Sequence, residues 1–135
     1  MFVFVYGTLR PSLYPHRSNG KPSRPATLEA NFVMWNLGRF PALVPQPQSQ
    51  CLTTIKGEVI EVEDVQVFDA YEGYRANGKG LYDREQFVVV IEETGEIVSA
   101  WTYFMHPERF EQRADGTAQR VPSGDWAAAM PCPTR

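Results

Sequence analysis

The residue with the clearest potential for chemistry is Glu72, a carboxylate within residues 64–73, a segment that predicts a short helix. At about 100° per residue, Glu72 falls on the same helix face as Val65 and Phe68, where an apolar side chain is expected. It also lies in the last turn, where the helix dipole disfavours negative charge. One residue therefore breaks two local rules, and such violations concentrate at functional sites.

The environment expected for Glu72 suits proton transfer. Burial and the negative end of the helix dipole would both raise the pKa of this carboxyl group, which favours a general base and acid near neutral pH. The structural alternative is that Glu72 reaches past the apolar stripe to water or pairs with Arg75 or Arg84. Asp69 is the nearest rival carboxylate, and its short side chain at the edge of the same face predicts a solvent-facing role.

A second candidate is the first stretch of the chain, MFVFVYGTLR, in which a strand-like run over residues 2–6 stops at Gly7. Because glycine lacks a Cβ, Gly7 can adopt a positive φ and leave backbone N–H groups pointing outward. Such a group of donors suits a carboxylate or another anion. On the glycine alone, an ordinary turn after the strand is the simpler interpretation.

Other constellations are weak. His16 and His106 are isolated and have no metal-ligand spacing to Cys51 or Cys132, so no metal site is expected. Thr8 has no base at a recognisable spacing, and we expect a backbone or capping role for it. The sequence contains no G-x-S-x-G, P-loop or G-x-G-x-x-G motif.

The composition indicates one globular domain over residues 1–135, with 43% hydrophobic residues and a formal net charge of −3. This charge does not favour nucleic acid as a partner. No apolar run approaches the length of a membrane span, and the first residues lack the basic start of a signal peptide. Two cysteines do not imply a disulfide framework. We therefore expect a soluble cytoplasmic protein.

The elements that must position these residues are mostly strands. Strands are expected over residues 2–6, 28–37, 52–62, 82–91 and 97–105, and the last two form a hairpin. Gly57 predicts a bulge or a close approach of another backbone within its strand. Residues 10–27 and 38–51 are rich in proline, glycine and polar residues, which predicts loops, and the basic side chains of the first loop are expected to be solvated.

Helices complete the expected fold. Asp64 as N-cap and Gly73 as terminator bound the clearest helix. Pro107 opens a short helix over residues 107–114, and residues 125–130 predict a last helical turn. Since the links between strands are short, antiparallel pairing should dominate. The predicted class is an α+β domain with a curled or closed sheet, one main helix and one or two short ones.

Several short pieces of the sequence, taken together, carry a family resemblance. They are YGTL at residues 6–9, FPAL at 40–43, GEV at 57–59, DAYEG at 69–73, Tyr82 with Arg84, WTY at 101–103, and SGDW at 123–126. Their order resembles that of the gamma-glutamylcyclotransferase-like family, which includes the avirulence-induced plant proteins and gamma-glutamylamine cyclotransferase. No piece is specific alone, but the ordered set spans nearly the whole chain.

The resemblance implies a small mixed, largely antiparallel β-barrel with flanking helices and a pocket. Backbone N–H groups of the first loop would bind the α-carboxylate of a substrate, a role that falls on Tyr6, Gly7, Thr8 and Leu9. Glu72 matches the family's catalytic glutamate, and Tyr82 matches a pocket tyrosine near it. Family members cleave a gamma-glutamyl amide by internal attack, releasing 5-oxoproline and an amine, and use no metal or organic cofactor.

Two alternatives share this fold. One is a binding module that keeps the carboxylate-binding loop without turnover, and the other is a protein that docks a partner on the proline-rich residues 10–27. In many relatives the loop after the first strand soon enters a helix, whereas residues 10–27 show no helical pattern, which leaves the leaving amine open. We expect a small-molecule gamma-glutamyl substrate and neither nucleic acid nor a membrane as partner. The sequence determines neither the oligomeric state nor whether Cys51 and Cys132 pair.

Overall fold

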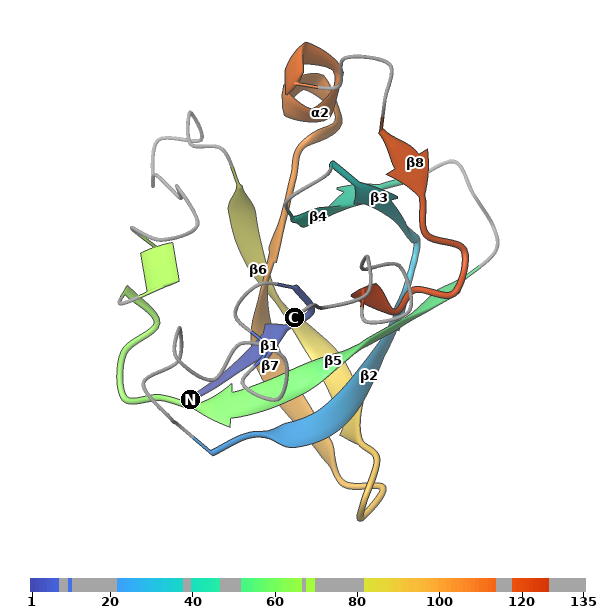
Figure 1. The fold of residues 1–135 in the computed structure, drawn as a ribbon. Coiled ribbons are helices and arrows are strands. Elements are labelled where there is room, and N and C mark those ends of the chain that lie inside the picture. Colours follow the sequence, from blue (N-terminus) through green and yellow to red (C-terminus); the bar gives the residue numbers. More distant parts are fainter. Residues whose placement is uncertain are drawn as a thin grey trace, which may run out of the picture.

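Two β-sheets make up most of the computed structural model, which describes residues 1–7, 10, 22–37, 40–46, 52–66, 68–69, 82–113 and 118–126. One sheet is a closed five-stranded barrel and the other has three strands (Figure 1). The predicted mixed, largely antiparallel barrel of an α+β fold is therefore confirmed. Within these described ranges, no helix is long and apolar enough to cross a membrane.

The barrel closes through one parallel contact. Its strands, in hydrogen-bonded order, are β1 (Phe2–Val5), β5 (Thr53–Glu61), β2 (Arg24–Ala30), β6 (Asp83–Ile91) and β7 (Ile97–Phe104). Strands β1 and β7 run parallel, and the other four pairs are antiparallel. The predicted β6–β7 hairpin is confirmed, with Gly95 at φ 75° in the connecting turn.

Strand β1 is buried on both faces, which explains its uninterrupted apolar sequence. Phe4 and Tyr6 belong to one hydrophobic cluster, which also contains Trp126. Val3 and Val5 belong to a second cluster, formed with side chains of the second sheet and of the segment after β5. The strand therefore leads from the centre of the core directly to Gly7.

The predicted close approach at Gly57 is confirmed. A Cβ on this residue of β5 would lie 2.4 Å from the carbonyl oxygen of Val5 and 2.7 Å from the Phe4 ring. Only a glycine lets β5 come this near to β1 without a shift of the backbone.

The second sheet lies against one end of the barrel, above it in the view of Figure 1. Its order is β4 (Pro41–Pro45), β3 (Phe32–Asn36) and β8 (Gln119–Arg120). Backbone hydrogen bonds join it to neighbouring segments, from Met105 N–H to the carbonyl of Leu43 and from Val121 N–H to that of Met34, both 2.8 Å long.

One strand prediction and two loop predictions were wrong in their bounds. The strand expected over 28–37 is divided at Asn31 between β2 and β3, which belong to different sheets. Residues 24–27, expected in a loop, begin β2, where the Pro25 carbonyl accepts a hydrogen bond from Glu92 N–H. Residues 41–45, expected to be irregular, form β4, because its two prolines lie at the ends of a strand on the sheet edge.

The helix predictions lie only partly within the described residues. The predicted N-cap is confirmed, since the Asp64 carboxylate accepts a 2.9 Å hydrogen bond from Gln66 N–H and helical residues follow. The remainder of that predicted helix lies outside the described residues. The short helix predicted from Pro107 is confirmed as α2 (Pro107–Arg113), which packs on the second sheet through a Phe110–Trp35 ring contact of 4.9 Å.

Candidate functional site

Two residues predicted to line one site, Gly7 and Tyr82, both lie against Pro41. A Cβ on Gly7 would be 2.6 Å from Cγ of Pro41 and 2.7 Å from its Cδ, so the absence of a side chain allows the contact. The buried Tyr82 hydroxyl donates a 3.2 Å hydrogen bond to the carbonyl oxygen of Pro41. The start of the first loop, the start of β4 and the residue before β6 therefore meet at this proline.

The first loop turns back immediately after β1. The Arg10 N–H donates a 3.0 Å hydrogen bond to the Gly7 carbonyl, an i+3 to i contact typical of a β-turn. Tyr6 sends its side chain toward the core, where the hydroxyl donates a 2.7 Å hydrogen bond to the carbonyl of Tyr103. This hydrogen bond holds Tyr6, the residue just before the turn, in place.

A second anchored segment is the one that contains Asp69. Its carboxylate accepts a 2.5 Å hydrogen bond from the Tyr103 hydroxyl and pairs with Arg84, whose Nε lies 3.1 Å away. The Arg84 guanidinium in turn stacks on Trp101, 4.7 Å from the ring centroid. The Asp69 side chain is only 15% exposed. The expected solvent-facing role is therefore wrong, because β7 packs its tyrosine against this helical segment.

The two anchored segments share Tyr103. Its carbonyl accepts the hydrogen bond from Tyr6, and its single hydroxyl proton is shared between the Asp69 carboxylate and, at 3.3 Å, the carbonyl of Val65. Tyr103 of β7 therefore holds both the residue before the first loop and the first turn of the helical segment. The sequence predicts that this helix continues to Glu72.

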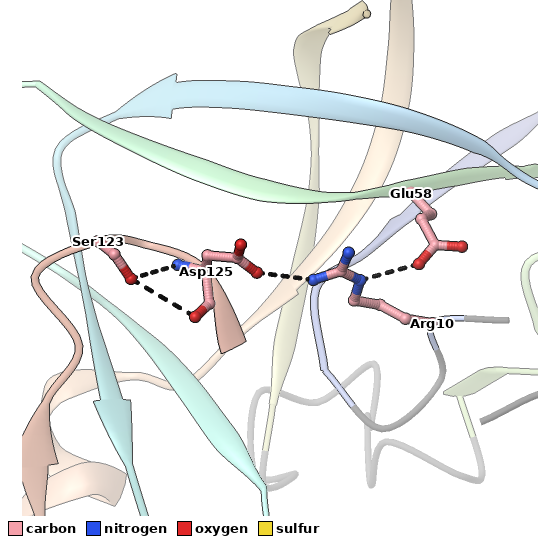
Figure 2. Close-up of polar contacts among 4 residues, drawn as sticks. All are labelled: Arg10, Glu58, Ser123 and Asp125. Carbon is pink, nitrogen blue, oxygen red and sulfur yellow. Dashed lines mark hydrogen bonds and ion pairs between the residues drawn. The ribbon is translucent and has the colours of Figure 1, made fainter. Parts of the chain in front are cut away.

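The structure also assembles a charged cluster that the sequence did not indicate (Figure 2). Arg10 lies between the carboxylates of Glu58 and Asp125, at 2.9 Å and 3.0 Å. Its side chain is 12% exposed, so the expectation of solvated basic side chains is wrong for this residue. The sequence pattern of β5 puts Glu58 on the same face as the exposed Lys56, and no local signal reveals its burial.

A known protein family matches nearly the whole chain. The family model described as "Gamma-glutamyl cyclotransferase, AIG2-like" matches residues 3–128. The chain belongs to this family. The match covers the first loop, the Asp69 segment, Tyr82 and the cluster around Arg10.

Individual relatives of this AIG2-like chain point the same way. The protein named "Putative gamma-glutamylcyclotransferase MJ1514" from Methanocaldococcus jannaschii is 30% identical over 112 residues, which cover 79% of this chain and 85% of the relative. The solution structure of At5g39720.1 from Arabidopsis thaliana has a TM-score of 0.55 and 26% identity, over 83% of this chain and 78% of that one. An AIG2-like protein from Mus musculus has the same fold, with a TM-score of 0.53, 22% identity and 81% coverage of both chains.

Three of the six site residues expected from the AIG2-like resemblance lie within the described residues, namely Tyr6, Gly7 and Tyr82. Thr8, Leu9 and Glu72 lie outside them, and their roles stay predictions. Among the described residues, no group of three histidine, cysteine, aspartate or glutamate side chains is arranged to hold a metal ion.

The role of Tyr103 can be tested by replacement with phenylalanine. Loss of its hydroxyl removes a hydrogen bond from the partly buried Asp69 carboxylate and another from the Val65 carbonyl. We expect Tyr103→Phe to lower the free energy of unfolding by about 1–3 kcal/mol in urea titrations. A double-mutant cycle with Asp69→Ala, which removes the acceptor oxygen, should give a coupling of about 0.5 kcal/mol or more. Additive effects of the two changes would contradict this contact.

Proposed function

We propose that this protein is a gamma-glutamyl cyclotransferase, which converts a gamma-glutamyl amide into 5-oxoproline and a free amine. The observation that carries the proposal is the meeting of Gly7 and Tyr82 at Pro41 in a chain of this family. Both residues match positions that the family resemblance assigns to substrate binding, and they come from distant parts of the sequence.

Binding would begin at the first loop. Backbone N–H groups of residues 6–9 would hold the α-carboxylate of the gamma-glutamyl group, since successive backbone donors in a tight turn suit an anion. The hydrogen bond between Arg10 N–H and the Gly7 carbonyl supports a turn here. Tyr82, which contacts the same proline as Gly7, would line the adjoining wall of the pocket.

Glu72 would carry the proton. It would take a proton from the α-ammonium group of the substrate, and the freed amine nitrogen would attack the γ-carbonyl carbon. The new C–N bond closes the five-membered ring, the C–N bond to the leaving group breaks, and Glu72 returns the proton to the departing amine. The ring nitrogen still carries two protons and gives up one of them to the same amine, which leaves as an ammonium ion. Atoms balance without water or any second substrate.

The attack is intramolecular, so a large part of the acceleration would come from holding the substrate in a folded conformation. A fixed α-carboxylate places the neighbouring amine within reach of its own γ-carbonyl. Backbone donors close to that carbonyl would also stabilise the negative charge that develops on its oxygen. The first loop would therefore contribute by holding the substrate, beside the proton transfer by Glu72.

The proposal is tested by incubating the purified protein with a panel of gamma-glutamyl amino acids and gamma-glutamyl amines. We expect 5-oxoproline and the free amine in equal amounts from at least one member of the panel. Release of glutamate in place of 5-oxoproline would contradict the proposal, because it means that water attacks the amide. Saturable binding without any product would identify the silent binding module instead.

A further inference from the structure

We infer that Arg10 is a positioning residue for the carboxylate-binding loop, held in place by two carboxylates from distant parts of the chain. The inference rests on the proposed function in one respect only, namely that residues 6–9 bind a carboxylate. It assigns a role to the cluster of Arg10, Glu58, Asp125 and Ser123 in Figure 2.

The first carboxylate is deeply buried. The Glu58 side chain is 3% exposed, and its Oε2 accepts a 2.9 Å hydrogen bond from Nε of Arg10. Its other oxygen, Oε1, accepts a 2.7 Å hydrogen bond from the Ser23 hydroxyl. A carboxylate this far from water requires a cationic partner, because removing one partner of a buried pair is strongly destabilising. Glu58 therefore fixes the Arg10 guanidinium against β5.

The second carboxylate is held by the same strand. Asp125 Oδ1 lies 3.0 Å from Nη1 of Arg10, and the Asp125 N–H donates a 3.2 Å hydrogen bond to the Ser123 hydroxyl. Between them, Gly124 has a φ of 67°, and its carbonyl accepts a 2.8 Å hydrogen bond from Lys56 N–H of β5. The turn that carries Asp125 is thus fixed to the strand that carries Glu58.

Arginine is suited to this position because two separate nitrogens meet two carboxylates. Lysine keeps the charge but offers one nitrogen on a flexible stem, so it cannot reproduce both contacts in the same geometry. The Arg10 backbone N–H closes the turn on the Gly7 carbonyl. The guanidinium therefore holds one end of the turn, while the contact of Gly7 with Pro41 holds the other.

The positive charge of Arg10 should also favour carboxylate binding at the first loop. Without it, the negative charges of Glu58 and Asp125 would remain beside a loop proposed to attract another carboxylate, and like charges at short range repel. With it, the charge of the buried Glu58 is compensated. Geometry and charge therefore both predict that Arg10 influences carboxylate binding more than the chemical step.

The test compares two ligands that differ in the carboxylate alone. 5-Oxoproline retains the α-carboxylate of the substrate, whereas 2-pyrrolidinone has the same ring without it. For Arg10→Lys, we expect the Kd of 5-oxoproline to rise about tenfold, equivalent to about 1.4 kcal/mol, and that of 2-pyrrolidinone to stay unchanged. In the turnover assay, KM for a gamma-glutamyl amide should rise while kcat changes little.

Matched controls separate this role from general stability. Arg24 forms an exposed ion pair with Glu96, so Arg24→Lys should leave both Kd values unchanged. If Arg10→Lys does not fold, Asp125→Asn replaces it in the test, because it removes the charge of the more exposed carboxylate. We expect Asp125→Asn also to raise the Kd of 5-oxoproline.

Three results would overturn the inference. Equal weakening of both ligands by Arg10→Lys would indicate a structural role only, and unchanged binding of 5-oxoproline would exclude positioning. A wild-type protein that does not prefer 5-oxoproline over 2-pyrrolidinone would refute the carboxylate-binding loop itself, and this inference with it. If the wild type prefers 5-oxoproline over 2-pyrrolidinone and Arg10→Lys does not change this preference, the inference is refuted and the proposed function stands.

Discussion

Replacement of Glu72 by glutamine is expected to lower kcat for 5-oxoproline formation by about 10²- to 10⁴-fold, the usual contribution of a general acid–base group. Glutamine has nearly the same shape and can neither accept the proton of the α-ammonium group nor deliver one to the leaving amine. Binding of 5-oxoproline should remain, because the first loop provides the donors for its carboxylate. The measurement is a steady-state assay of 5-oxoproline beside a binding titration.

Two carboxylates near Glu72 in the sequence provide controls for Glu72→Gln. Glu63 is exposed, and Glu63→Gln should leave kcat unchanged. Asp69 pairs with Tyr103 and Arg84, so Asp69→Asn should destabilise the protein but retain turnover in the folded fraction. Product at the wild-type rate from Glu72→Gln would refute its role, and loss of turnover in Asp69→Asn alone would transfer the base to Asp69.

The sequence predicts elements of this fold whose signals are local. The apolar run of β1, the strand β5 with its glycine and the β6–β7 hairpin follow from periodicity and turn residues. The division at Asn31 does not, because the apolar alternation continues across it and only sheet pairing decides where each strand belongs. Strand β4 was missed since proline discourages a strand unless it lies at a strand end or a sheet edge, which is a tertiary property.

The candidate site also contains residues that the sequence can predict and residues that it cannot. Gly7 and Tyr82 could be proposed from the family resemblance, and the structure brings both to Pro41. The burial of Glu58 could not be predicted, because the alternation of β5 assigns it to the exposed face, and Arg10 and Ser23, both distant in sequence, bind its carboxylate. Long-range partners, and not local sequence, decide the environment of such a charged side chain.

Gly57→Ala is expected to lower the free energy of unfolding by about 3 kcal/mol, at the upper end of the usual effect of overpacking. The added Cβ would lie 2.4 Å from the backbone oxygen of Val5, an atom that cannot move without displacing β1. Because β1 leads into Gly7, the displacement should also weaken binding of 5-oxoproline in the folded fraction. Urea unfolding and a binding titration on the same variant measure the two effects.

Gly95→Ala is the matched control, since it separates steric conflict from the loss of glycine itself. Gly95 has a φ of 75°, and a Cβ there meets nothing within 4 Å. Its replacement should therefore destabilise by only about 1 kcal/mol, the strain of a left-handed residue, and should leave 5-oxoproline binding unchanged. If Gly57→Ala were no more destabilising than Gly95→Ala, the contact of β5 with Val5 would not be tight. The position of the first loop would then rest on the contacts of Pro41, Arg10 and Tyr6.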